Sequence, residues 1–333
     1  MEEKKNDIEK LVSIIIINWN GEKFLSDCIE SVKAQSYEQK EIILVDNASE
    51  DKSLLDILPA RKKMSKKEDV ILIKNNVNMG FCAAANQGIK KSRGGIIILL
   101  NQDVILDKNF AKNIAGTFIE NKAAGMVSGK ILRMDRRTID SAGQFMNSWC
   151  KPIERGYNKN DRGQYNIKTK SFSVCGAAAC YRRTTLEEIK IKDEYFDENF
   201  FAFYEDLDIS WRAQLKGWEA FFNPGAIVYH YRGGSQNKDQ RFQILGRSKN
   251  IQLKIIFNRY QMIIKNASIT HCLLYLPFLL KRSIVDMFFV IIFFPDIPMI
   301  FKEIKLFRSA WKKRAVIQAE RTTPDKIIMK YII

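Results

Sequence analysis

Short apolar runs alternate with segments of helical periodicity along the first half of the chain. The runs are rich in Val, Ile and Leu, like strands buried on both faces of a sheet, and they occupy residues 12–17, 42–45, 70–73, 96–100 and 126–131. Between the first two runs, apolar residues recur at spacings of three and four, which gives a helix one buried face, at Leu25, Cys28, Ile29 and Val32. A second helix is predicted at residues 81–90. This alternation predicts an α/β fold with a Rossmann-like, mostly parallel central sheet flanked by helices.

Polar residues stand at or just beyond the carboxyl ends of three predicted strands. They are Asn18, Asp46 and Asp103. Open α/β sheets bind their ligands at this edge, because the carboxyl ends of parallel strands meet there. The sequence therefore predicts a ligand site to which these three residues contribute.

A cluster of acidic residues lies in the second half of the chain. Glu205, Asp206 and Asp208 follow an aromatic run at residues 200–204 and begin a helical pattern that ends at Gly217. Apolar neighbours can hold a carboxylate partly desolvated, as a general base requires. The alternative is an ordinary helix N-terminus, where the helix dipole favours Asp and Glu.

Length and cysteine usage indicate the class of protein. The 333 residues allow one large α/β domain with an appendage, or two domains. The six cysteines are scattered without a CxxC pair, which favours reduced thiols over disulfides or a zinc site. The polar N-terminus has no hydrophobic signal region, so we expect a cytoplasmic protein. The segment at 151–170 is polar and turn-rich and is expected to be a mobile loop.

Positive charge is concentrated near the C-terminus. Residues 231–333 hold 19 Lys and Arg against 6 Asp and Glu, which accounts for +13 of the net charge of +16. The basic residues bracket an apolar stretch at 272–301 and accompany no nucleic-acid recognition motif. This combination favours an anionic membrane surface as the partner over nucleic acid.

The composition of the apolar stretch indicates how it would contact a membrane. Lys281, Asp286 and several prolines interrupt it, so its charge-free runs are shorter than the roughly 18–20 residues that span a bilayer. We expect residues 235–333, with a basic helix at 241–260, to lie peripherally on the membrane and to be dispensable for the ligand site at the edge of the sheet. A buried homodimer interface and an inserted hairpin are the alternatives. His271, which opens the stretch, is expected at the interface.

Six short patterns occur in order along the chain. They are VSIIIINWNG at 12–21, EIILVDNASED at 41–51, NMGFCAAANQGI at 78–89, IILLNQDV at 97–104, GAAACYRR at 176–183 and YEDLD at 204–208. Together they resemble family 2 glycosyltransferases of the GT-A fold, and within that family the bacterial rhamnosyltransferase-like branch that builds surface polysaccharides. The resemblance covers residues 11–234 and implies that residues 1–234 form a GT-A domain.

The resemblance implies an inverting transfer of a sugar from a nucleotide-sugar donor to a lipid-linked saccharide, at the cytoplasmic face of the cell membrane. The branch implies dTDP-rhamnose as the donor. A UDP-hexose or UDP-galactofuranose donor is an alternative, and so is a non-catalytic scaffold of the same fold that binds a nucleotide sugar or the membrane.

The resemblance also assigns residues that bind the nucleotide sugar. They are Asn18, Trp19, Asn20, Asp46, Asn78, Gly80, Asn86, Asn101 and Asp103. Asn101 and Asp103 stand where the family has its DxD motif, so Asp103 would provide most of the protein's binding to Mg²⁺ or Mn²⁺. His230 either contacts this metal or a phosphate group, or is structural.

The catalytic base implied by the resemblance is the aspartate of the Glu-Asp pair, Asp206. It would deprotonate an acceptor hydroxyl as that oxygen attacks the anomeric carbon. Glu205 is expected to position the acceptor or the donor sugar, and Asp208 to be structural. Spacing alone leaves open which of Glu205 and Asp206 is the base.

Overall fold

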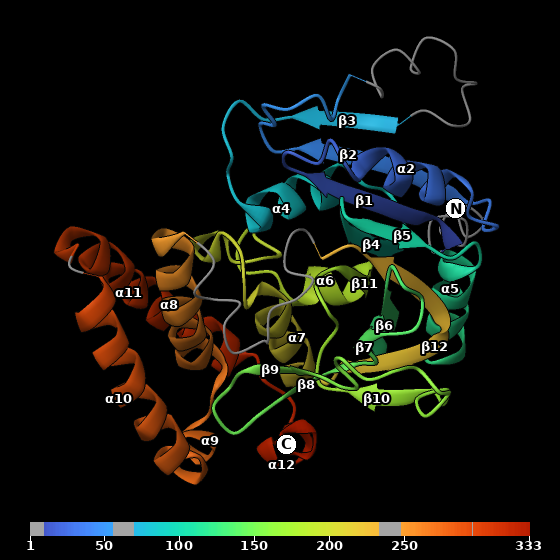
Figure 1. Cartoon of the computed structure of the whole chain (residues 1–333). Helices are drawn as coiled ribbons and strands as arrows, with labels where there is room; N and C mark the ends of the chain where they lie inside the picture. The colour runs from blue at the N-terminus through green and yellow to red at the C-terminus, as the bar shows by residue number, and fades with distance from the viewer. Residues whose placement is uncertain (1–9, 56–69, 233–247, 295) are drawn as a thin grey trace.

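A computed structural model describes residues 10–55, 70–232, 248–294 and 296–333 of the chain (Figure 1). The predicted domain boundary at residue 234 and the beginning of the predicted basic helix, 241–247, lie outside these described residues. Strands and helices alternate through the first half, and the chain ends in a series of helices. The arrangement confirms the predicted α/β fold.

Four of the five predicted strands form one side of a central sheet, and the fifth, predicted at 126–131, lies on the other side. The four are β1 (Val12–Asn18), β2 (Lys40–Asp46), β3 (Val70–Lys74) and β4 (Ile96–Asn101). The other side is built from β5 (Val104–Leu106), β6 (Ala124–Arg133), β7 (Ile139–Ser141), β10 (Thr169–Ser171), β11 (Ala178–Arg182) and β12 (Glu219–His230). The order along the sheet is β10-β12-β6-β11-β4-β1-β2-β3, with β11 antiparallel between β4 and β6. A separate hairpin pairs β8 (Gln144–Met146) with β9 (Pro152–Glu154).

Helices cover both faces of the sheet, and the alternation of side chains along β1 explains how. Ile14 and Ile16 pack with α2 (Leu25–Lys33) and α5 (Phe110–Glu120). Ile15 and Ile17 point to the opposite face and pack with α4 (Phe81–Lys91), α6 (Arg183–Ile189) and α7 (Glu205–Leu215). Each fully buried Ile contributes about 1.5–3 kcal/mol, so the apolar run of β1 stabilises both layers.

The C-terminal helices pack against this second face. They are α8 (Lys249–Asn266), α9 (Ile269–Leu274), α10 (Leu276–Phe293), α11 (Ile297–Ala319) and α12 (Asp325–Ile328). Met262 of α8 and Ile317 of α11 belong to the same hydrophobic cluster as Ile15 and the α7 residue Leu207. The C-terminal region therefore shares a core with the sheet, although α10 and α11 lie at its outer edge (Figure 1).

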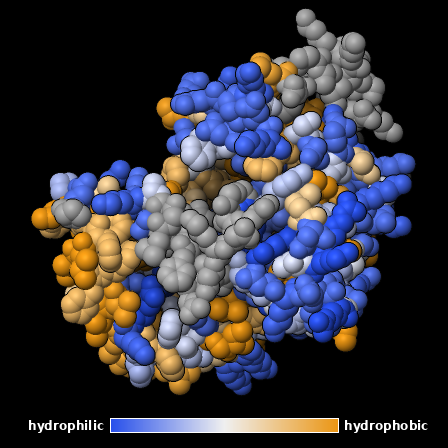
Figure 2. Space-filling view, viewed as in Figure 1, coloured by the Kyte–Doolittle hydropathy of each residue, from blue (hydrophilic) through white to orange (hydrophobic). Residues whose placement is uncertain are grey.

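Apolar side chains are exposed on these outer helices. Hydrophobic residues gather on the side of the molecule where α9, α10 and α11 lie (Figure 2). The exposed residues there include Leu273, Ile284, Phe288, Ile291, Ile292 and Phe301. None of the helices in the described part of the chain combines the length and the apolar character needed to cross a membrane.

His271 is buried, so the prediction that it lies at an interface is wrong. Its side chain is 2% exposed, its ring centroid lies 5.1 Å from that of Trp211, and Nε2 lies 3.5 Å from Sγ of Cys150. Burial lowers the pKa of His271 to about 4, so the ring is neutral at physiological pH. Helix α9 turns this residue inward and exposes Ile269 and Leu273 instead.

Candidate functional site

Asn18 and Asp46 lie side by side at the carboxyl ends of β1 and β2, where they are register partners. Asn18 Nδ2 lies 2.8 Å from Asp46 Oδ1 and 3.0 Å from the hydroxyl oxygens of Ser49 and Ser53, which share its two N–H groups. Both residues are buried, and Asn18 Oδ1 has no hydrogen-bond partner within the described residues. A buried acceptor without a partner at the ligand-binding edge of a sheet fits a site that a bound molecule completes.

The turn after β1 carries Trp19 and Asn20. Asn20 has φ +52° and is tied to the turn after β2, because its Oδ1 accepts from Glu50 N–H at 2.9 Å and its own N–H donates to Ser49 Oγ at 2.9 Å. Trp19 is 52% exposed at the tip of this turn. Its indole face is therefore accessible for stacking on a planar ligand.

Asn78 and Gly80 are held in place by Asn47, a residue that the sequence analysis missed. Asn47 Nδ2 donates to Asn78 Oδ1 at 2.9 Å, and Asn47 Oδ1 accepts from Met79 N–H at 3.0 Å. Gly80 has φ +86°, and a Cβ atom there would lie 2.4 Å from the Phe201 ring. Glycine is therefore required at position 80 by both its backbone conformation and its contact with the loop before α7.

Asn86 does not have a free amide for a nucleotide sugar. Its Oδ1 accepts from the N–H groups of Tyr195 and Phe196, and its Nδ2 donates to Phe196 O and Glu198 Oε1 at 2.9 Å. These contacts use the two donors and both lone pairs of the side chain. In this structure Asn86 joins α4 to residues 195–198, which is a structural role and not the expected ligand contact.

Asp103 and His230 come together although they are distant in sequence. Asp103 Oδ2 lies 3.3 Å from His230 Nε2, and His230 Nδ1 lies 2.8 Å from Asp140 Oδ2. Asp140 also accepts from Arg232. Burial alone would lower the pKa of His230, but its hydrogen bonds to Asp103 and Asp140 raise this pKa to about 9. Asn101 lies two residues before Asp103, and its backbone N–H donates to Ala177 O at 3.1 Å.

Asp103 and His230 would serve as metal ligands only once His230 has lost its Nε2 proton, because a histidine ligand is a neutral imidazole and the raised pKa of His230 favours the protonated ring. A metal-binding histidine usually donates its second ring nitrogen to a carboxylate, and Asp140 is that partner for Nδ1 of His230. Within the described residues no group of three or more His, Cys, Asp or Glu is placed to hold a cation. A divalent ion here would therefore take two protein ligands and complete its shell with phosphate oxygens and water.

Glu205 and Asp206 occupy the first turn of α7. Asp206 Oδ2 accepts from Gly176 N–H at 3.1 Å and from Gln144 Nε2 at 3.1 Å, and Oδ1 accepts from Leu207 N–H at 2.8 Å. Glu205 Oε2 is buried without a hydrogen-bond partner within the described residues. Burial raises the pKa of both carboxyl groups, and the charge of Asp206 raises that of Glu205 further.

Gln144 and Glu154 support Asp206, and the sequence analysis missed both. Gln144 Nε2 donates to Glu154 Oε1 at 2.7 Å as well as to Asp206. Burial raises the pKa of Glu154 to about 7 against the opposing hydrogen bonds from Ser141 and Gln144. Glu154 belongs to the segment 151–170 expected to be a loop, of which residues 152–154 form β9 and pair with β8, and 169–170 begin β10.

Asp208 is structural, as predicted. It is buried and forms ion pairs with Arg212 at 3.1 Å and with Lys265 at 2.9 Å. Asn266 Nδ2 donates at 2.8 Å to Asp208 Oδ1, the same oxygen that contacts Lys265. These partners, from α7 and α8, take up both oxygens of the carboxylate, so Asp208 is not available to bind an acceptor saccharide.

We expect the Glu205–Asp206 pair to make the stability of the protein depend on pH. Because the folded pair holds a proton that the unfolded chain releases, its contribution to the free energy of unfolding falls as pH rises through the raised pKa values. Glu205→Gln removes one of these groups, so the variant should lose less stability than the wild type between about pH 5 and about pH 8. Urea unfolding at both pH values measures the difference. Parallel pH profiles for the two proteins would contradict it.

Comparisons with known proteins identify the family. The sequence model of glycosyl transferase family 2 matches residues 13–190. The poly-β-1,6-N-acetyl-D-glucosamine synthase of Staphylococcus aureus (strain COL) is 23% identical over 220 residues, which cover 66% of this chain and 49% of that protein. The synthase of the same name from Staphylococcus epidermidis is 22% identical over 218 residues. The chain spans about half the length of the curated relatives it matches.

Solved structures share the fold. S. aureus TarS 1–349 in complex with UDP-GlcNAc has a TM-score of 0.58 at 17% identity and covers 93% of this chain and 84% of its own. GalNAc-T7 with UDP, GalNAc and Mn²⁺ has a TM-score of 0.58 at 16% identity, and the match covers 77% of this chain and 48% of that one. These GT-A structures confirm the predicted fold class. Since the family match covers more than half of the 333 residues, the chain belongs to glycosyl transferase family 2.

Proposed function

We propose that this chain is an inverting glycosyltransferase that moves a sugar from a nucleotide-sugar donor to a hydroxyl group of a saccharide. The proposal rests on two separate sets of polar residues, one at the edge of the sheet and one at the start of α7. Asn18, Asp46 and Asp103 follow parallel strands, at the edge where open α/β sheets bind nucleotides. Asp206 starts α7 with a raised pKa, which supports its use as a general base.

The proposed chemistry is a single displacement. As the acceptor oxygen bonds to the anomeric carbon, its proton passes to the Asp206 carboxylate. The bond between the anomeric carbon and the diphosphate oxygen breaks, and its electron pair leaves with the nucleoside diphosphate. Attack from the side opposite the leaving group inverts the anomeric configuration without a covalent intermediate on the protein.

The leaving diphosphate gains negative charge as this bond breaks. Asp103 and His230 would hold a Mg²⁺ or Mn²⁺ ion, which when bound supplies charge neutralisation. Asn101 adds no charge at the first position of the DxD motif, so we propose a metal affinity below that of a two-carboxylate site.

Two donor classes are supported by different observations. The ordered sequence motifs resemble the rhamnosyltransferase-like branch, which favours dTDP-rhamnose. The solved neighbours hold UDP or UDP-GlcNAc, and the curated relatives are named for an N-acetylglucosamine polymer, which favours a UDP-hexose. UDP-galactofuranose is a third donor to include in any screen.

A thermal-shift screen of these nucleotide sugars, with and without millimolar Mn²⁺, tests the proposal. A donor at 100 times its dissociation constant stabilises the protein by about 2.7 kcal/mol. We expect one donor class to stabilise the wild type, and Asp103→Asn to lose the Mn²⁺-dependent part of that shift. Asp193→Asn, at an exposed position, is the matched control. Stabilisation by no nucleotide sugar would argue against the function, and equal Mn²⁺ effects in Asp103→Asn would argue against the metal site.

We further propose that the exposed apolar face of α9–α11 rests on the cytoplasmic surface of an anionic membrane, next to a lipid-linked acceptor. The face carries exposed Lys281, Lys302 and Lys305 among its Ile and Phe side chains. Each Lys or Arg near an anionic surface contributes about 1 kcal/mol, and the charges are screened by salt. Apolar side chains that insert into the membrane contribute a part of the binding free energy that salt does not weaken.

We therefore expect full-length protein to bind vesicles that contain phosphatidylglycerol, and binding to weaken with salt without vanishing. The double variant Phe288→Glu, Ile292→Glu should release the protein from these vesicles. Ile119→Glu, at an exposed position on α5, is the control and should bind normally. Co-sedimentation measures all three. A protein that ignores the vesicles and forms a dimer broken by the double variant would instead assign this face to a homodimer.

A further inference from the structure

The segment that leads into α7 has an unfavourable backbone conformation. Phe201, Phe203 and Tyr204 have φ values of +62°, +71° and +68°, in the region that side chains other than glycine rarely adopt. Each such residue is unfavourable and persists only where its surroundings enforce it. Glu205 and Asp206 follow immediately, so the direction in which α7 presents them depends on whatever holds this segment.

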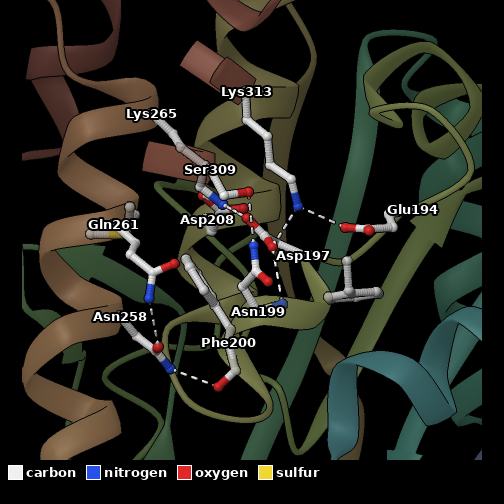
Figure 3. A network of polar contacts seen from close by, with 12 residues as sticks. Glu194, Asp197, Asn199, Phe200, Asp208, Asn258, Gln261, Lys265, Ser309 and Lys313 are labelled. Carbon is white, nitrogen blue, oxygen red and sulfur yellow. Dashed lines mark hydrogen bonds and ion pairs between the residues drawn. The ribbon is translucent and has the colours of Figure 1, made fainter. Parts of the chain in front are cut away.

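Asn258 of α8 holds the segment from one side. Its Nδ2 lies 2.9 Å from Phe200 O (Figure 3). The same nitrogen lies 2.9 Å from Ala202 O and 3.0 Å from Phe203 O. Three carbonyl groups converge on one buried amide and share its two N–H groups, while Phe200 O also accepts from Ala202 N–H. Gln261 Nε2 lies 3.4 Å from Asn258 Oδ1 and orients the amide.

Two lysines hold the beginning of the segment. Asp197 accepts from Lys265 of α8 at 2.6 Å and from Lys313 of α11 at 2.6 Å (Figure 3). Burial alone would raise the pKa of Asp197, but the two lysine charges hold it well below the usual range. Lys265 also pairs with Asp208 on α7, so one buried ammonium group joins the two ends of residues 197–208.

We propose that Asn258, Lys265 and Lys313 are positioning residues for the acceptor side of the site. They fix residues 197–208 in the conformation that directs Glu205 and Asp206 to an acceptor. These three residues lie on α8 and α11, and α11 also carries part of the exposed apolar face. Helices α8 and α11 therefore support the acceptor side of the site, and are not only a means of attachment. The catalytic part of this inference rests on the proposed function, whereas the part concerning the loop conformation does not.

Asn258→Asp in the full-length chain is the first test. The variant keeps the shape of the side chain but replaces the donating amide with a carboxylate that faces three carbonyl groups. Asn250→Asp, the same change at an exposed position of the same helix, is the matched control. Hydrogen exchange of residues 200–206 needs no substrate, and we expect its protection to fall by about tenfold or more in Asn258→Asp only.

The kinetic result separates positioning from general stability. We expect Asn258→Asp to lower kcat by about 10²-fold, the scale for a catalytic group misplaced by about 1 Å, while KM and the thermal shift for the nucleotide sugar stay unchanged. Unchanged exchange and unchanged kcat would overturn the proposal. If wild-type protein transfers no sugar but the exchange result holds, the proposed function fails and the positioning of the loop stands.

A second pair of variants covers the case in which Asn258→Asp does not fold. Lys313→Gln removes one of two cations from Asp197 at the edge of the network, and Lys312→Gln changes the exposed neighbouring residue. We expect faster exchange of residues 197–206 in Lys313→Gln than in Lys312→Gln. Equal exchange in the two variants would overturn the role of α11.

Discussion

Replacing Asp206 with asparagine should reduce sugar transfer by about 10²–10⁴-fold, which is the range for loss of a general base. An asparagine oxygen can still accept from Gly176 N–H and Gln144, two of the three donors that fix the present carboxylate, while the amide nitrogen loses the bond from the third, Leu207 N–H. The side chain therefore keeps its place but cannot take the acceptor proton. Binding of the nucleotide sugar should be nearly unchanged, because Asn18, Asp46 and Asp103 remain intact.

Initial rates together with donor titration by thermal shift measure this separation. Glu205→Gln is the informative companion, since the raised pKa of Glu205 favours a protonated group that glutamine resembles. Wild-type turnover in Asp206→Asn, with inactivity in Glu205→Gln, would exchange the roles of the two residues. Loss of donor binding in Asp206→Asn would place this carboxylate on the donor side.

The central sheet could be predicted because its signals are local. The β-branched run of β1 is buried on both faces, and its alternating side chains serve two separate clusters. The same reasoning placed Asn18 and Asp46 at one edge, since parallel strands bring their carboxyl ends together. The acidic first turn of α7 was also visible, because Glu205 and Asp206 stand beside an aromatic run.

The residues that the sequence analysis missed depend on contacts between distant parts of the chain. Gln144 is 62 positions from Asp206, and Asn258 is 58 positions from Phe200. Glutamine and asparagine of this kind are common on helices and hairpins, so no local pattern marks them. Asn86 shows the opposite error, because a motif position expected to bind a ligand has all of its hydrogen bonds inside the protein.

The C-terminal helices are likewise joined to the rest of the molecule by contacts between distant parts of the chain. Charge and apolar character predicted an appendage on the membrane that the nucleotide site does not need. Truncation near Lys265 would remove α9 to α12, and with them Ile317 from the main hydrophobic cluster and Lys313 from Asp197. Periodicity reports which face of a helix is apolar but does not report which neighbour receives its few buried charges.

Lys265→Met should lower the free energy of unfolding by about 3–5 kcal/mol, the scale for breaking a buried ion pair from one side. The ammonium group is fully buried and pairs with both Asp197 and Asp208. Methionine fills a similar volume but leaves both carboxylates with fewer donors in an apolar setting. Since Asp197 retains Lys313 and Asp208 retains Arg212, we expect a loss near the lower end of this range.

Urea unfolding of full-length protein measures this loss, with Lys249→Met at the exposed start of the same helix as the control. The control should stay within about 0.5 kcal/mol of the wild type, as is usual for surface substitutions. A similarly small change in Lys265→Met would mean that the network around Asp197 adds no net stability. The positioning of residues 197–208 would then have to come from Asn258 and from apolar packing, and Asn258→Asp alone would impair transfer.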